Sequence, residues 1–207
     1  METKTHVLFI LDSSGSMAAI HKEAVNHFNE QIQQIKMSAG KQDVRVSLVT
    51  FNSPGSDKIL YWLKPLAAID ELKYEEFKPA GTTALFDTIG KHVTQARNVL
   101  PPEEAGLVVI ITDGEENSST EFKGETVKKI MTDLEASPNW TVAYMGANQN
   151  MFDVAQHLGI KVQSTRSFDA TGQGLNAAAG HTSSSYASYF NDREKGIQKK
   201  NFWDKES

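Results

Sequence analysis

Short apolar segments that end at a polar turn are the feature that most limits how this sequence can fold. Residues 7–11 and 107–111 are such segments, and each is apolar at every position. Both are too short for a typical helix, so they are expected to be strands. A strand that is apolar at every position is buried on both faces, which is typical of a parallel sheet covered by helices. The expected fold class is therefore α/β.

Amphipathic helical segments separate the expected strands. Apolar residues recur at helical spacing up to a stop near Gly40, between residues 81 and 101, and in residues 120–136 and 151–158. Further strands are expected at residues 44–51, 59–63, 140–145 and 160–162. The alternation predicts a mostly parallel central sheet with helices on both faces. Because residues 53–56 form a short turn, the strand near 59–63 is expected to be antiparallel and at an edge.

The chain is expected to form one domain, residues 1–191, followed by a charged tail, residues 192–207. The domain would end with a helix over residues 171–191, in which small residues alternate with tyrosines and a phenylalanine. The tail carries Phe202 and Trp203. It is expected either to be solvated or to dock, and the two aromatic residues either bind a partner or pack back on the domain.

Composition excludes several classes of function. Of the 207 residues, 39% are hydrophobic and 23% are charged, which is typical of a globular protein. No apolar run approaches the roughly 20 residues that a membrane-spanning helix needs, and the N-terminus does not resemble a secretory signal. A net charge of -5 without a Lys/Arg block disfavours binding to nucleic acid or to anionic membranes. With zero cysteines, a cytoplasmic location is expected.

Oxygen-bearing side chains follow the expected strands and precede one of the helices. Asp12, Ser14 and Ser16 come directly after the first strand, Thr83 lies in the loop before a helix, and Asp113 follows a later strand. In an open parallel sheet, ligands bind at the carboxyl ends of the strands. Two carboxylates and three hydroxyls, without sulfur or imidazole, form a ligand set for Mg²⁺ or Mn²⁺ and disfavour zinc.

Three separate motifs carry a resemblance to a known family. The sequence Asp-Ser-Ser-Gly-Ser at residues 12–16 resembles the Asp-x-Ser-x-Ser signature of the von Willebrand factor type A (vWA) domain. The threonine loop from Gly81 and the Thr-Asp-Gly sequence at residues 112–114 resemble two further motifs of that family, in the same order. The resemblance extends from about residue 5 to about residue 190. It implies a Rossmann-like vWA fold.

The same resemblance implies a metal-ion-dependent adhesion site (MIDAS). The implied ligands are Asp12, Ser14, Ser16, Thr83 and Asp113, with Mg²⁺ or Mn²⁺ bound and an acidic residue of a partner protein completing the shell. Thr83 is preferred because its distance to the following helix matches the family, although Thr82 is only one residue away. The expected function is a metal-dependent protein–protein interaction module. Some members of the family shift their last helix when the metal shell changes, so by analogy the helix at residues 171–191 is a candidate for such a movement.

Other interpretations remain open. The Asp/Ser-rich turn would also suit a helix N-cap, and residues 115–117 are either a solvated loop or a rim that selects basic residues of a partner. A metal-dependent hydrolase is the alternative from another class, but no histidine is close to the three motifs in sequence. An adaptor for an ATPase, kinase or phosphatase, and a structural component of a phage or other large assembly, are further alternatives.

Overall fold

The computed structural model describes residues 4–203, except for the side chains of Asn176 and Ala179. Strands and helices alternate along the chain, except that the third strand follows the second directly. The strands are β1 (Lys4–Asp12), β2 (Asp43–Phe51), β3 (Lys58–Pro65), β4 (Ala105–Thr112), β5 (Trp140–Ala147) and β6 (Thr165–Phe168). The α-helices are α1 (His21–Ser38), α2 (Leu85–Val99), α3 (Gly124–Ala136), α4 (Met151–Leu158) and α5 (Gly172–Glu194).

The strands form a single six-stranded sheet in the order β3-β2-β1-β4-β5-β6. All neighbours pair in parallel except β2 and β3, which form an antiparallel hairpin at one edge. This arrangement confirms the α/β class and the antiparallel edge strand. Because β1 and β4 are central neighbours, the segments that follow them emerge side by side at the same edge of the sheet.

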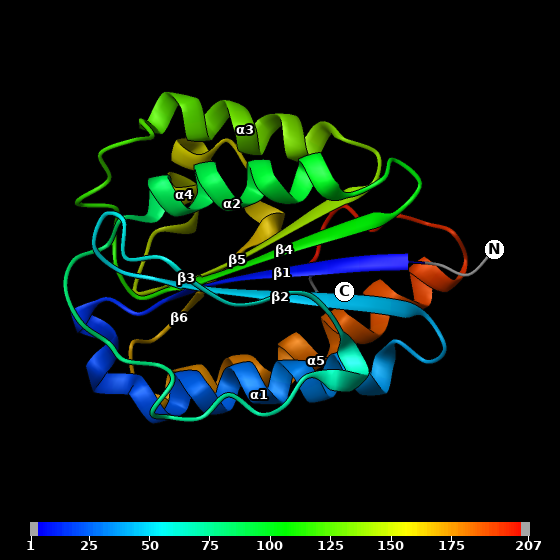
Figure 1. Cartoon of the computed structure of the whole chain (residues 1–207), viewed down its shortest axis with the longest axis horizontal. Helices are drawn as coiled ribbons and strands as arrows, with labels where there is room; N and C mark the ends of the chain where they lie inside the picture. Colours follow the sequence, from blue (N-terminus) through cyan, green and yellow to red (C-terminus); the bar gives the residue numbers. More distant parts are fainter. Residues whose placement is uncertain (1–3, 204–207) are drawn as a thin grey trace.

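Helices cover both faces of the sheet, as the fully apolar strands predict. Alternate residues of β1 point in opposite directions: Phe9 packs in the core beneath α1 and α5, whereas Ile10 packs in the core beneath α2, α3 and α4. Figure 1 shows these two helical layers above and below the sheet. Since each face of β1 is buried, a polar residue inside the strand would be costly, and the first carboxylate appears only at its end.

Two expected boundaries are wrong. The last strand is β6, not residues 160–162, because Gly159 ends α4 in a left-handed conformation (φ 68°) and Ile160 packs into the core beside it. The short 3-10 helix Val162–Ser164 follows before β6 begins. The helix expected from residue 120 begins only at Gly124. The backbone N–H groups of residues 120–122 instead donate to the carboxylate of Asp87.

The segment after residue 191 continues the domain in space. Helix α5 runs to Glu194, and Phe202 and Trp203 are buried. The Phe202 ring packs edge-on against Tyr186, with ring centroids 5.1 Å apart. The Lys200 ammonium donates to the backbone oxygen of Trp140 at 3.0 Å. Of the two expectations for this segment, packing back on the domain therefore holds for residues up to 203.

Candidate functional site

Three loops meet at the edge of the sheet where β1 and β4 end. The loop after β1 is held against the loop before α2 by two backbone hydrogen bonds, from Gly15 N to Gly81 O at 3.1 Å and from Ala80 N to Ser13 O at 2.9 Å. The turn after β4 lies beside them because β4 pairs with β1. These loops are at the left in Figure 1. Side chains from distant parts of the sequence can therefore converge here.

Asp12 is the innermost residue of the site, with none of its surface exposed. Its Oδ1 accepts a hydrogen bond from Ser14 N at 2.7 Å, and its Oδ2 accepts one from Thr112 Oγ1 at 2.5 Å. Burial raises the pKa of Asp12 to about 6, and the charge of Asp113 adds to this, while the hydrogen bonds act in the opposite direction. A buried carboxylate that is costly to ionise gains much from a nearby cation.

Hydroxyl groups connect Asp12 to the second carboxylate of the site. Ser14 Oγ lies 3.1 Å from Ser16 Oγ, and Ser16 Oγ donates to Asp113 Oδ1 at 2.7 Å. Burial raises the pKa of Asp113, and the hydrogen bond from Ser16 opposes that shift. Ser14 and Ser16 are two residues apart in a tight turn, so both hydroxyls reach the same side. The first motif and Asp113 thus form one continuous polar cluster.

The positions of Thr82 and Thr83 distinguish the two candidate threonines. Thr82 is exposed, and its Oγ1 donates to Ser53 Oγ at 3.1 Å. Thr83 is buried, and a Cβ placed on Gly114 would lie 2.9 Å from Thr83 Oγ1 and 3.7 Å from Asp12 Oδ2. Both oxygens therefore border the small space that Gly114 leaves beside its backbone. This geometry favours Thr83 as the member of the cluster.

The donor set fits a hard divalent cation. Asp12, Ser14, Ser16, Thr83 and Asp113 supply carboxylate and hydroxyl oxygens, which suit Mg²⁺ or Mn²⁺ with waters completing the shell. Within residues 4–203 there is no group of three or more His, Cys, Asp or Glu residues that could hold a metal. A site here would therefore depend on hydroxyl ligands as well as on the two carboxylates. That these residues bind a metal stays a prediction.

Sequence reasoning missed the residues that fix the loop after β4. Asn117 pairs with the Thr83 backbone: its Oδ1 accepts from Thr83 N at 2.9 Å, and its N donates to Thr83 O at 3.1 Å. Glu116 Oε2 accepts from Phe86 N, in the first turn of α2, at 2.7 Å. Glu116 and Asn117 therefore hold the site together and are not simply solvated. The only available signal was Glu116 preceding Ser118 and Ser119, whose backbone N–H groups it also binds.

Comparisons with known proteins show the family and the fold. The family model of the von Willebrand factor type A domain matches residues 6–171. A search of curated proteins gave no significant match. Among the described residues, the helices are each too short or too polar to cross a membrane.

Several solved structures share the fold at low sequence identity. Proximal thread matrix protein 1 from the mussel byssus, in a structure described as having a zinc occupied MIDAS motif, is 16% identical with a TM-score of 0.60 and covers 88% of this chain. Manganese-loaded Plasmodium vivax TRAP protein is 17% identical with a TM-score of 0.56 and covers 86%. The pilus adhesin SpaC from Lactobacillus rhamnosus GG is 12% identical with a TM-score of 0.67 and covers 91%.

This chain spans 45%, 71% and 30% of those three proteins, respectively, so two of them are much longer than the shared domain. Identities this low show a common fold only. The family match, in contrast, covers most of the sequence and includes all three motif segments. The chain therefore belongs to the von Willebrand factor type A domain family.

Proposed function

We propose that this chain is a metal-dependent protein interaction module. Asp12, Ser14, Ser16, Thr83 and Asp113 would hold Mg²⁺ or Mn²⁺ directly or through water. The ion would then accept a carboxylate from an Asp or Glu residue of a partner protein. One observation carries the proposal: oxygen-bearing side chains from three distant loops converge around the buried carboxylate of Asp12.

The chain's own residues have separable roles in this proposal. Thr112 and the Ser14 N–H fix the orientation of the Asp12 carboxylate. Ser16 positions Asp113 at the more exposed side of the cluster, where a partner could approach. The bound ion would supply positive charge for the incoming carboxylate in a partly desolvated site, where charge interactions are stronger than in water. Two of the structural relatives are described with zinc or manganese, which supports a divalent ion.

Neighbouring threonines provide a matched test of the ligand set. We expect Thr83→Ala to weaken binding of Mn²⁺ and Mg²⁺ in calorimetric titrations, because Thr83 Oγ1 borders the same space as Asp12 Oδ2. Thr82→Ala should leave affinity unchanged, since its hydroxyl contacts Ser53. Zn²⁺ should be titrated into the wild type and both variants in the same way. Equal affinities in the two variants, or absence of binding by the wild type, would contradict the proposed site.

Partner recognition needs a second experiment. Wild type and Asp12→Asn would each be used to capture proteins from native lysate, with Mg²⁺ and with EDTA. We expect a partner that is retained only by wild type with the metal, and its Asp and Glu residues can then be replaced singly. A partner retained under all four conditions would show that binding does not use the ion. Circular dichroism of Asp12→Asn serves as the folding control.

We propose no catalytic role for the cluster, because its two carboxylates would be engaged as ligands. The names of the structural relatives describe matrix and adhesin proteins, which supports a binding function. The cytoplasmic location and the adaptor and large-assembly alternatives stay expectations from the sequence.

A further inference from the structure

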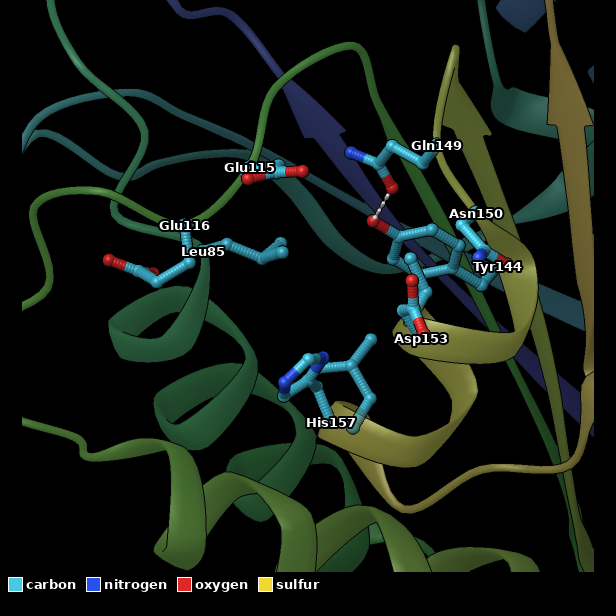
Figure 2. A pocket seen from close by; sticks show the side chains of 10 residues that line it. Leu85, Glu115, Glu116, Tyr144, Gln149, Asn150, Asp153 and His157 are labelled. Carbon is cyan, nitrogen blue, oxygen red and sulfur yellow. Dashed lines mark hydrogen bonds between the residues drawn. The ribbon is translucent and has the colours of Figure 1, made fainter.

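A pocket of about 280 Å³ lies next to the cluster, between the loop after β4 and helix α4. Figure 2 shows Glu115 and Glu116 on one side of it, and Tyr144, Asn150 and Asp153 on the other. Its size is near the lower end of the roughly 300–1,000 Å³ that small-molecule sites occupy. The pocket therefore suits one long side chain better than a large ligand.

Part of the pocket wall is apolar. Leu85 from the start of α2 and Val154 and Leu158 from α4 contribute hydrocarbon to its walls, together with the Tyr144 ring at the end of β5. The Tyr144 hydroxyl does not need a ligand, because it donates to Gln149 Oε1 at 2.8 Å (Figure 2). An occupant therefore needs an apolar stem that can cover these walls.

The opening of the pocket is acidic. Glu115 and Asp153 are exposed and come from the two opposite elements, and neither has an ion pair or hydrogen bond among the described residues. Glu116 also borders the pocket, but its carboxylate is engaged by the backbone of Phe86 and by its own loop. No lysine or arginine is among the described residues that line the pocket. Asp153 lies in the first turn of α4, where the helix dipole favours a negative charge, and His157 of the same helix also lines the pocket (Figure 2). The two carboxylates nevertheless give the opening of the pocket a negative charge, because no lysine or arginine among the described lining residues faces them there.

The pocket differs from the cluster around Asp12, because no serine or threonine among its described lining residues adds a hydroxyl ligand to these carboxylates. A cation with a long apolar stem would match both the apolar wall and the acidic opening of the pocket. We propose that the pocket receives the side chain of a lysine or arginine from a partner protein. The methylene stem would lie against Leu85, Val154 and Tyr144, and the charged end would reach Glu115 and Asp153.

The pocket lies beside the cluster around Asp12. Gln149 Nε2 donates to Gly114 O at 2.9 Å, and Gly114 directly follows Asp113. The negative charges of Asp12 and Glu115 both raise the pKa of Tyr144, in addition to the larger effect of burial. The pocket and the cluster around Asp12 are thus adjacent. One consequence rests on the proposed function: the partner then presents a basic residue close to the acidic residue that ligates the ion.

The pocket can be tested without the metal and without knowing the partner. ¹⁵N-labelled protein in EDTA would be titrated with the blocked amino acids Nα-acetyl-lysine methylamide and Nα-acetyl-arginine methylamide. The uncharged analogue Nα-acetyl-norleucine methylamide tests whether the stem alone suffices. We expect at least one cationic probe to shift amide signals of the loop after β4 and of α4, and the norleucine probe to bind much more weakly.

Charge-neutralising variants provide the decisive comparison. In Glu115→Gln/Asp153→Asn, the dissociation constant of the cationic probe should rise by about tenfold, because two exposed ion pairs are lost. The control Glu71→Gln/Glu75→Gln removes two charges from a separate acidic groove beside α1 and should bind like wild type. Unchanged affinity in the first variant, equal binding of norleucine, or no binding of either cation would overturn the inference.

The same variants distinguish failure of this inference from failure of the metal site. Glu115 and Asp153 are outside the proposed ligand set, so calorimetric affinity for Mn²⁺ should change little in Glu115→Gln/Asp153→Asn. Loss of probe binding with intact Mn²⁺ binding supports a separate pocket. Probe binding in a protein that binds no metal would support the pocket while removing the proposed metal-dependent function.

Discussion

Thr112 Oγ1 donates a hydrogen bond of 2.5 Å to Asp12 Oδ2, and these two residues end the neighbouring strands β4 and β1. Thr112 Oγ1 also accepts from Gly114 N at 3.1 Å. One hydroxyl therefore links the first acidic motif to the turn that carries the second. The relative position of the two carboxylates depends on sheet pairing and on this side chain together.

Replacing Thr112 by Val should test that link. The substitution keeps the shape of the side chain but removes the donor to a fully buried carboxylate, so we expect the free energy of unfolding to fall by about 1–3 kcal/mol. Urea unfolding in EDTA measures the change. Thr112→Ser keeps the hydroxyl and should recover most of the loss. Wild-type stability in Thr112→Val would mean that Asp12 does not depend on this bond.

A methyl group at position 114 should displace Thr83. The added Cβ would lie 2.9 Å from Thr83 Oγ1, which is closer than a Cβ atom normally approaches another heavy atom. We expect Gly114→Ala to lower Mn²⁺ affinity by about 10-fold or more, as changes next to metal ligands commonly do. Gly180→Ala is the matched control, because nothing lies within 4 Å of its added Cβ and it is inside α5. Calorimetric titration should show wild-type affinity in that control.

Protonation of buried histidines should destabilise the domain in mild acid. His27 is buried between α1 and α5, both its ring nitrogens lack a partner among the described residues, and burial lowers its pKa to about 4. Because its pKa in the unfolded chain is near 6.5, the unfolded state binds the proton first. The free energy of unfolding is therefore highest above about pH 6.5. It falls by about 3 kcal/mol as the pH is lowered toward 4.

The variant His27→Leu should unfold with a weaker dependence on pH over this range. Urea unfolding at several pH values between 7 and 4 gives the slope for each protein. His6, whose pKa burial also lowers to about 4, retains part of the dependence. His181→Gln, at an exposed position, is the control and should follow the wild type. A His27→Leu slope identical to that of the wild type would refute the assignment.

The segment after α5 should contribute to the stability of the domain. Trp203 is only 5% exposed, packs edge-on against Phe202 with centroids 4.7 Å apart, and has the Arg166 guanidinium 5.4 Å from its ring centroid. We expect Trp203→Ala to lower the free energy of unfolding by about 3–5 kcal/mol, the usual cost of removing a buried aromatic side chain. Denaturant unfolding provides the measurement.

Ile197→Ala is the matched control for Trp203→Ala. It lies in the same segment but is 52% exposed, so its effect should stay within about 0.5 kcal/mol. If both variants unfold like the wild type, residues 196–203 are not part of the cooperative unit. That result would favour the other expectation from the sequence, a solvated tail.

Sequence patterns predicted most of the fold because burial on both faces leaves a local signature. The apolar runs at residues 7–11 and 107–111 predicted strands buried on both faces, and the short turn at residues 53–56 predicted the antiparallel edge strand. The pattern was wrong at residues 160–162, where Ile160 is apolar because it packs beside the end of α4. An apolar residue indicates burial, but it does not by itself distinguish a strand from a loop that packs into the core.

By itself, the sequence determined the α/β class, the family motifs and the chemical types of the candidate ligands, since these depend on local periodicity and on residue identity. Only the tertiary structure decided that Thr83 is buried and borders the same space beside Gly114 as Asp12, whereas Thr82 is exposed, and that Glu115 and Asp153 line a common pocket. The physical reason is that a side chain's direction is set by contacts far away in sequence. The hydrogen bonds that Thr83 N donates to Asn117 Oδ1 and that Thr112 Oγ1 donates to Asp12 Oδ2 exist only once β1 and β4 have paired.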